Sequence, residues 1–357
     1  MKNAFFEKLF LVALRFFMLI WLLIYPQMSD AQIKNIRFKH ITVDDGLSNS
    51  WVHSILQDKY GFIWFGTDAG LDRYDGYSFR EYKNDFRDKN SISNSCILSI
   101  FEDSRGKFWI GSREGLNLYD RKNNRFIKNV IVQQQPAWSL AEDKDKNLWI
   151  GSTTNFWRYN IENDSVHTYT LPQRSIIART IFVDSRNNVW IGTYYGLLLY
   201  DKKKDSFVYY YHDDNDSSSL GNNNIFSILE DKAGRLWIGT QAGLELYTNS
   251  QHLSQKGIFE HYQNNSKDES SIAKGTIFSL LEDDKHNLWI GTENGGLDMI
   301  NLTNFQNRVN TFIHFKNDPS LGTSLSNNSI YSLCKDEQGN IWIGTYGDGI
   351  NRINLLK

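Results

Sequence analysis

The sequence lacks most of the local signatures that mark catalytic or metal-binding proteins. Its two cysteines, Cys96 and Cys334, fall at different positions of a repeat described below, so no structural disulfide is expected. The eight histidines form no His-x-x-x-His pair, and neither a Cys-x-x-Cys motif nor a calcium-loop motif occurs. A glycine-rich phosphate loop and a Gly-x-Ser-x-Gly motif are also missing. We therefore expect no metal and no cofactor.

Long hydrophobic runs are scarce as well. One apolar run, at about residues 16–25, follows Lys2 and Lys8, and small residues stand at Ser29 and Ala31. This arrangement predicts a secretory signal peptide over residues 1–31 and export of the mature chain. A membrane-spanning helix needs about 20 apolar residues, so an uncleaved anchor at the inner membrane is the alternative.

The chain carries no excess of positive charge. It has 39 Lys and Arg against 41 Asp and Glu, a formal net charge of −2. Because nucleic-acid binding depends on clustered basic side chains, this balance predicts no nucleic-acid partner.

What the chain does contain is a phrase repeated seven times, in which an aspartate precedes Trp-(Ile/Phe)-Gly-(Thr/Ser) by six residues. The tryptophans are spaced by 45, 40, 41, 47, 52 and 53 residues, a period typical of a propeller or solenoid. Residues that recur in every copy are expected to be structural. They are Asp58 and Trp64, Asp103 and Trp109, Asp143 and Trp149, Asp184 and Trp190, Asp231 and Trp237, Asp283 and Trp289, and Asp336 and Trp342.

One copy predicts the structure of all seven. Short runs rich in β-branched and aromatic residues, at 52–56, 62–67, 71–74 and 79–82, are separated by Gly, Asp and Asn turn signals. No run of helical period intervenes. Each copy is therefore predicted to be one propeller blade of four antiparallel strands, called A to D below. The tryptophan is expected to wedge between blades, and the glycine after it to let the next blade approach closely.

The ends of the chain predict how the ring closes. The aromatic pattern of strand D recurs six times, and the seventh copy ends after its strand C. A suitable run, Phe38 to Ile41, precedes the first strand A. We therefore predict an all-β, seven-bladed β-propeller over residues 32–357, in which this N-terminal strand completes the last blade and removes the exposed sheet edges.

The repeat resembles the two-component regulator propeller repeat over residues 36–357. The residues Ile41 to Ser50 and the phrase Ser324 to Asn328 are also similar to that family. The resemblance implies a periplasmic sensor domain of Bacteroidetes hybrid two-component systems, whose signal is an oligosaccharide and whose output is expression of glycan-degrading genes. Such sensors also contain a second propeller, an Ig-like domain and a histidine kinase. None is found here, so kinase activity is not carried over, and a second propeller or a sensor kinase is an expected partner.

Blades 3 and 4 depart from the repeat, and their D–A connections are short. Exposed aromatic rings stack on sugar faces, while Asn and Arg supply orienting hydrogen bonds. We therefore predict an oligosaccharide site on the face formed by the D–A and B–C loops, near blades 3 and 4. The alternative is that these aromatic residues pack in the core. The candidate residues are Trp138, Asn155, Trp157, Arg179, Tyr194 and Tyr195.

Two other functional classes compete with a non-enzymatic sensor. A propeller-type polysaccharide lyase or glycoside hydrolase would need converging acidic groups, and glycoside hydrolysis needs two carboxyls about 5–10 Å apart. The repeat aspartates each sit in a turn at a fixed offset and are expected to be structural. Glu293 and Asp348 are non-repeated acids in B–C loops, for which a catalytic role is not favoured. A protein-interaction scaffold is the third class. We therefore expect no enzyme activity and no catalytic residue.

Overall fold

Every strand of the unit that spans Lys39–Lys357 belongs to one of seven four-stranded antiparallel sheets. The computed structural model describes residues 36–128, 130–170, 177–248, 257–303, 305 and 311–354. The predicted signal peptide over residues 1–31 lies outside this part of the chain. Among the described residues, no helix is long and apolar enough to cross a membrane.

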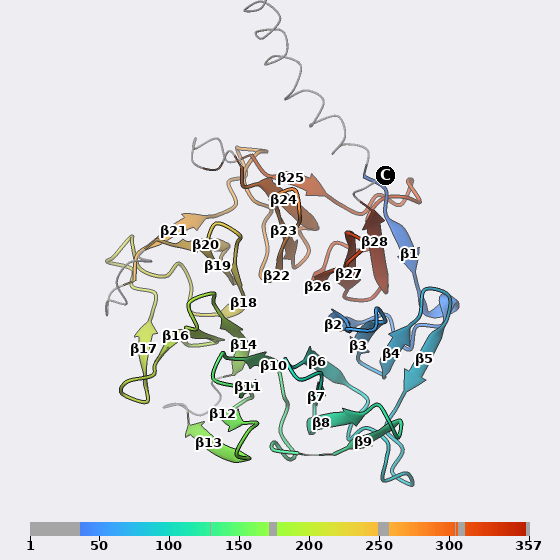
Figure 1. Cartoon of the computed structure of the whole chain (residues 1–357). Helices are drawn as coiled ribbons and strands as arrows, with labels where there is room; N and C mark the ends of the chain where they lie inside the picture. The colour runs from blue at the N-terminus through green and yellow to red at the C-terminus, as the bar shows by residue number, and fades with distance from the viewer. Residues whose placement is uncertain are drawn as a thin grey trace, which may run out of the picture. The chain divides into compact units, whose positions relative to one another are not determined.

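The sheets are the blades of a propeller whose strands A lie nearest the central axis (Figure 1). In the order of strands A to D, blade 1 consists of β2 (Val52–Gln57), β3 (Ile63–Thr67), β4 (Leu71–Tyr74) and β5 (Phe79–Tyr82), and blade 2 of β6 (Ile97–Glu102), β7 (Phe108–Ser112), β8 (Gly115–Asp120) and β9 (Arg125–Ile127). Blade 3 consists of β10 (Ser139–Glu142), β11 (Asn147–Gly151), β12 (Asn155–Asn160) and β13 (Ser165–Thr170), and blade 4 of β14 (Ala178–Val183), β15 (Val189–Thr193), β16 (Gly196–Asp201) and β17 (Ser206–Tyr210). Blade 5 consists of β18 (Ile225–Glu230), β19 (Leu236–Thr240), β20 (Leu244–Tyr247) and β21 (Phe259–Tyr262), and blade 6 of β22 (Ile277–Glu282), β23 (Asn287–Thr292), β24 (Leu297–Asn301) and β25 (Ile313–Phe315). Blade 7 consists of β26 (Ile330–Lys335), β27 (Asn340–Thr345), β28 (Ile350–Asn354) and β1 (Lys39–Ile41).

The predicted closure of the ring is confirmed. Strand β1 pairs antiparallel with β28, with Lys39 opposite Arg352 and Ile41 opposite Ile350. The N-terminal strand therefore supplies strand D of blade 7, one residue shorter than expected. A 3-10 turn, η1 (Val43–Asp45), then leads the chain into blade 1. The four predicted strands of blade 1 agree with the observed bounds to within one residue.

Each repeat aspartate accepts a hydrogen bond from the indole of its own blade. The distance from Trp Nε1 to Asp Oδ2 is 2.8–3.0 Å in all seven blades. In blade 6, Asp283 Oδ1 also accepts from the backbone N–H groups of Lys285 and Asn287. Both residues of the pair are buried, with Asp283 1% and Trp289 0% exposed. The aspartate thus shapes the A–B turn and at the same time fixes the orientation of the indole.

The oriented tryptophans fill the spaces between blades, as predicted. Trp149 of blade 3 packs with Ile181, Val189 and Leu198 of blade 4, and Trp342 of blade 7 packs with residues of blade 1. The glycine that follows each tryptophan permits this approach. A Cβ atom on Gly344 would lie 2.9 Å from Val52 of blade 1, closer than real carbon contacts allow.

A buried polar side chain at the second or third position of strand C holds the D–A loop of five blades. Ser93 N–H donates to Asn117 at 2.9 Å, Ala273 N–H donates to Asp298 at 2.6 Å, and the other three anchors are Asp72, Glu245 and Asn351. All five anchors are 0% exposed. In blades 3 and 4 the corresponding residues are the apolar Trp157 and Leu198, and the D–A connections span residues 128–138 and 171–177.

Three histidines of strand D strengthen the same connections. His314 lies 2.6 Å from Asp298 and 3.0 Å from the backbone oxygen of Glu269, and His261 bridges Glu245 and the backbone oxygen of Ser217 in the same way. His40 in β1 contacts the backbone oxygen of Ser324 at 2.7 Å. His261 and His314 are therefore structural, and their recurrence at one position reflects a shared role in fixing the long loops.

The Asp–Trp pair predicts a large stability effect. Asp283→Ala leaves four donors in or near the blade interior without a partner: the indole, two backbone N–H groups and the Asn287 amide. We expect a loss of at least about 3 kcal/mol in the free energy of unfolding, measured with urea. Asp284→Ala is the matched control, because the neighbouring carboxylate is exposed and, among the described residues, bonds to Lys232 and Lys335 alone. Equal effects of the two substitutions would contradict the assignment.

The strand-C anchors predict a pH effect in blade 1. Burial raises the pKa of Asp72 to about 6, although Ser48 donates to the carboxylate. Because the folded pKa is raised, Asp72 favours folding below pH 4, and this contribution is lost as pH rises to about 6. Asp72→Asn introduces the amide that blades 2 and 7 have at this position. Because an amide does not titrate, the variant should not lose stability between pH 4 and 6. We expect wild type to lose up to about 3 kcal/mol relative to the variant between pH 4 and 7.

Urea unfolding of both proteins at several pH values measures this difference. A difference that stays constant with pH would show that Asp72 does not titrate in this range.

Candidate functional site

The residues nearest the propeller axis are placed by an irregularity of strand A. The pairing of strands A and B shifts by one residue in six blades, for example between Val52 and Ser54 and between Ile330 and Ser332. Such β-bulges redirect one side chain out of the regular ladder. Together with Trp138, the residue before β10, these extra residues define what we call the axial ring. It consists of His53, Leu98, Trp138, Arg179, Phe226, Phe278 and Tyr331.

Members of the axial ring from neighbouring blades contact one another. The guanidinium of Arg179 lies 4.9 Å from the centre of the Trp138 ring. Phe226 and Phe278 are 5.2 Å apart, and Phe278 and Tyr331 stack at 4.3 Å. The axial ring is therefore a mainly aromatic collar at the start of the innermost strands, beside the D–A loops.

The axial ring carries two hydrogen-bond donors that have no partner among the described residues. The Trp138 indole N–H is buried without an acceptor, and Arg179 forms neither a hydrogen bond nor an ion pair there. Every Asp and Glu after residue 35 belongs to the described part of the chain, so none of these carboxylates forms an ion pair with Arg179. Burial lowers the pKa of Arg179, against the opposing influence of Tyr194 and Tyr331. Arg179 is partly exposed and the buried Trp138 N–H lacks an acceptor, so this pair of donors is suited to an acceptor supplied from outside.

The B–C loops add a second tier of aromatic residues above the axial ring. Tyr194 lies 5.3 Å from Phe226, and Tyr346 stacks on Tyr331 at 5.2 Å. The rings of Trp51 and Tyr346 stack at 4.0 Å. Each of these loop aromatics is more than one-third exposed. Aromatic surface that is half accessible is the usual setting for stacking on a sugar ring.

The structure separates the candidates named from the sequence. Trp138, Arg179 and Tyr194 belong to this aromatic region, and Tyr195 packs beside Tyr211 in the next loop. Trp157 is 8% exposed and lies in the hydrophobic core between blades 2 and 3 with Trp109 and Tyr159. Its unusual identity reflects the missing loop anchor of blade 3. Asn155 starts β12 and pairs with Thr170, and it makes no side-chain contact with the axial ring in the described structure.

A polar hollow of about 930 Å³ opens on the same face between blades 5 and 6. It is lined by amide, hydroxyl and charged side chains, among them Gln241, Gln263, Asn264, Lys274 and Glu293. Glu293 accepts a hydrogen bond from Thr276 at 2.8 Å. The candidate region therefore extends from blades 3 and 4, where the sequence placed it, around to blades 5, 6 and 7.

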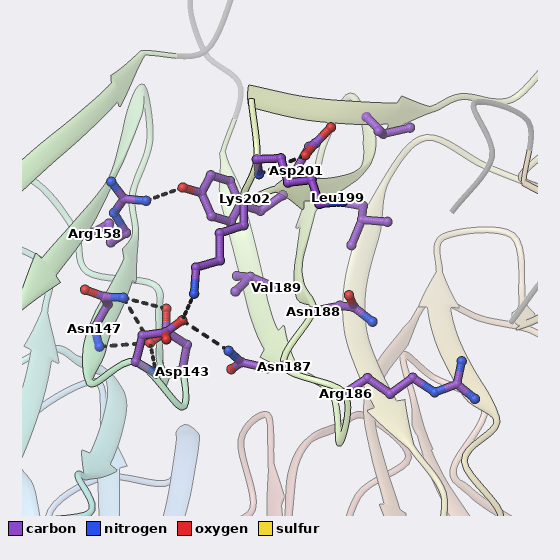
Figure 2. A pocket seen from close by; sticks show the side chains of 14 residues that line it. Asp143, Asn147, Arg158, Arg186, Asn187, Asn188, Val189, Leu199, Asp201 and Lys202 are labelled. Carbon is purple, nitrogen blue, oxygen red and sulfur yellow. Dashed lines mark hydrogen bonds and ion pairs between the residues drawn. The ribbon is translucent and has the colours of Figure 1, made fainter. Parts of the chain in front are cut away.

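A second hollow, of about 450 Å³, lies on the opposite face between blades 3 and 4 (Figure 2). Its charged groups satisfy one another. Lys202 bonds to Asp145 at 2.5 Å, Asn187 bonds to the same carboxylate, and Arg158 contacts Tyr200. These pairs hold the A–B and C–D turns together, so this hollow reads as a structural junction, in contrast to the unpaired donors of the axial ring.

Sequence reasoning missed five members of the axial ring because it compared whole blades. Phe226, Phe278 and Tyr331 look unremarkable within their own strands, and His53 and Leu98 do as well. Aligning the seven copies on the residue directly before the strand-A Ser or Thr would have identified the collar. The structure also brings His53 next to Asp68 and Cys96, two residues that form no local motif with it.

Comparison with known proteins identifies the family. The model named two component regulator propeller matches seven times, at residues 46–69, 91–114, 132–154, 170–195, 219–242, 271–294 and 324–347. The chain belongs to the two component regulator propeller family. Each match runs from the D–A loop through strands A and B into the B–C loop, so each contains the Asp–Trp pair and one member of the axial ring.

Relatives place this regulator propeller among sensor proteins. The extracellular domain of a putative hybrid two component system of B. thetaiotaomicron is 26% identical, with a TM-score of 0.74, over 90% of this chain and 42% of that chain. A second such domain from that organism gives 26% and 0.72 over 89% and 39%. A segment of 62 residues, 17% of this chain and 4% of its relative, is 48% identical to Histidine kinase P4 of Formosa agariphila. The chain thus spans less than half the length of these relatives.

Virginiamycin B lyase from Staphylococcus aureus shares the fold at 12% identity, with a TM-score of 0.65 over 90% of this chain and 99% of the lyase. At this identity the likeness concerns the architecture alone.

The two unusual tryptophans of blade 3 should respond differently to truncation. Trp157→Ala removes a buried core residue and should cost about 3–5 kcal/mol of unfolding free energy. Trp138→Ala removes a partly exposed ring from the axial ring and should cost about 1 kcal/mol or less. Urea or thermal unfolding of both variants measures this contrast. A loss at Trp138 as large as that at Trp157 would make Trp138 a core residue.

Proposed function

We propose that this regulator propeller is the ligand-sensing part of a two-component signalling system and that it binds an oligosaccharide over the axial ring. The family and the sensor domains that resemble this chain support the sensory part of the proposal. We infer an oligosaccharide ligand from the aromatic and polar side chains of this surface. If the ligand is an oligosaccharide, the signal would control glycan utilisation. We also propose an exported, periplasmic location and a non-enzymatic role.

The observation that carries the proposal is the pair of unpaired donors within an aromatic collar. A sugar presents an apolar face of C–H groups and a rim of oxygen acceptors. Phe226, Phe278 and Tyr331 would contact the apolar face, while the Trp138 indole and the Arg179 guanidinium would donate to ring or hydroxyl oxygens. A carboxylate or sulfate on the sugar would pair most strongly with Arg179.

The polar hollow between blades 5 and 6 would extend the site to further sugar units. Its amides and hydroxyls offer both donors and acceptors, which sugar hydroxyls require. A site that combines a stacking platform with such a hollow suits a chain of several sugars better than a monosaccharide.

The proposal predicts that donors of the axial ring control affinity. Arg179→Gln and Trp138→Ala should each weaken oligosaccharide binding at least about tenfold, since a lost hydrogen bond to a charged group costs about 1.5–3 kcal/mol. Isothermal titration with matched neutral and uronic-acid-containing oligosaccharides measures the change. Tyr77→Ala is the control, because Tyr77 is 97% exposed in a C–D turn on the opposite face.

Binding that is unchanged in both axial-ring variants would contradict the proposed site. Product analysis after incubation with the bound oligosaccharide would expose a lyase or hydrolase in place of a sensor.

A further inference from the structure

Three potential metal ligands from separate segments converge beside the axial ring. His53 is the bulged residue of β2, Asp68 follows β3 in the B–C loop of blade 1, and Cys96 directly precedes β6 of blade 2. His53 Nε2 lies 3.2 Å and Cys96 Sγ 3.0 Å from the same carboxylate oxygen, Asp68 Oδ1. The three ligand atoms all lie within 4.8 Å of one another.

The backbone holds these three residues firmly. Asp68 N–H donates to the backbone oxygen of Trp51 at 3.2 Å, and the backbone oxygen of Cys96 accepts from Arg113 at 3.0 Å. Cys96 N–H also donates to the Asn94 side chain at 2.8 Å. The thiol is buried, whereas the side chains of His53 and Asp68 are 15% and 31% exposed. The cluster is therefore preorganised and open on one side.

The other blades do not have His, Asp or Cys at the positions of His53, Asp68 and Cys96. The position of Asp68 is taken by Arg113, Tyr194, Gln241, Glu293 and Tyr346 in five other blades. The position of Cys96 is taken by Trp51, Ile177, Asn224, Thr276 and Ser329. Imidazole, thiol and carboxylate thus occur together at one blade junction only, where the scaffold itself has no need of them.

This donor set has the chemistry of a zinc-class site. Zn²⁺ accepts thiolate sulfur, imidazole nitrogen and carboxylate oxygen at about 2.0–2.3 Å, and sites with three protein ligands keep a fourth position open. Ligand atoms around a tetrahedral ion at those bond lengths are about 3.3–3.8 Å apart. The separations of 3.0 and 3.2 Å from Asp68 to its two neighbours are slightly shorter than this spacing, and the third separation, from His53 to Cys96, is at most 4.8 Å.

The protonation states are consistent with metal binding. Burial lowers the pKa of His53, and the neutral imidazole donates Nε2–H to Asp68, so Nε2 would bind a metal only after the ring passes its proton to Nδ1. Burial raises the pKa of Cys96 to about 12, so its thiol is protonated and donates to Asp68. A metal would replace this proton, which leaves to solvent as the sulfur–metal bond forms. Thiolate and carboxylate would then neutralise a dication, while the nearby positive charges of Arg113 and Arg179 moderate its affinity.

We propose that His53, Asp68 and Cys96 form a binding site for a zinc-class divalent cation at the junction of blades 1 and 2. The metal site requires no bound oligosaccharide. Since His53 lies in the axial ring, 6.1 Å from Tyr331, the open coordination position would be reached from the same face as the sugar site.

Cobalt titration of the full chain under reducing conditions tests the proposal, because a thiolate bound to Co²⁺ gives a charge-transfer band in the near ultraviolet. We expect one Co²⁺ per chain and displacement of the band by Zn²⁺. Cys96→Ser should abolish the band, and His53→Ala should weaken binding at least tenfold. Cys334→Ser is the matched control, since it removes the chain's other cysteine from the far end of strand A in blade 7.

Absence of the band in the wild-type chain overturns the proposal, and so does a band that survives Cys96→Ser or disappears in Cys334→Ser. Circular dichroism of each variant establishes that the propeller is still folded, so that a lost band reports the lost ligand.

Discussion

The propeller depends on one hydrogen bond, made seven times, between an aspartate in the A–B turn and the indole six residues later. The carboxylate is buried, and it remains a favourable acceptor because backbone and side-chain donors surround it. The bond fixes the turn and the direction of the indole together. That direction decides where the tryptophan meets the next blade, so turn geometry, wedge and blade spacing follow from one local contact.

A second set of buried contacts, between strand C and the D–A loops, accounts for other residues that distinguish one blade from the next. The strand-C anchors Asp72, Asn117, Glu245, Asp298 and Asn351 hold the D–A loops of five blades, and blades 3 and 4 have Trp157 and Leu198 in place of this anchor. An unusual residue in a repeat protein therefore has two possible origins. Trp157 is unusual because it takes the place of a loop anchor and packs in the core, whereas Trp138 is unusual without any structural requirement that explains it.

Sequence alone was enough for the architecture because each element is encoded locally. The Asp–Trp period predicted seven blades, the β-rich runs predicted four strands in each, and the incomplete last copy indicated the strand that ends at Ile41.

Sequence alone was insufficient for the candidate site, because a surface on a propeller is built from residues of several blades. Trp138 and Arg179 were predicted as candidates because they depart visibly from the repeat, but the stacked Phe278 and Tyr331 depend on contacts between blades that no local pattern reveals. His53, Asp68 and Cys96 stand 15 and 28 residues apart, so a search for short metal motifs could not connect them.

The bulged residue of strand A is the position where such a scaffold can change its chemistry at little cost to folding. It takes no part in the Asp–Trp bond, the inter-blade wedge or the loop anchor, and the one-residue shift in pairing frees it from the regular ladder. The seven copies accordingly hold an imidazole, an indole, a guanidinium, a phenol, two benzyl groups and an isobutyl group there. Variation confined to that position changes the chemistry of the axial surface and leaves the Asp–Trp bonds and the ring closure intact.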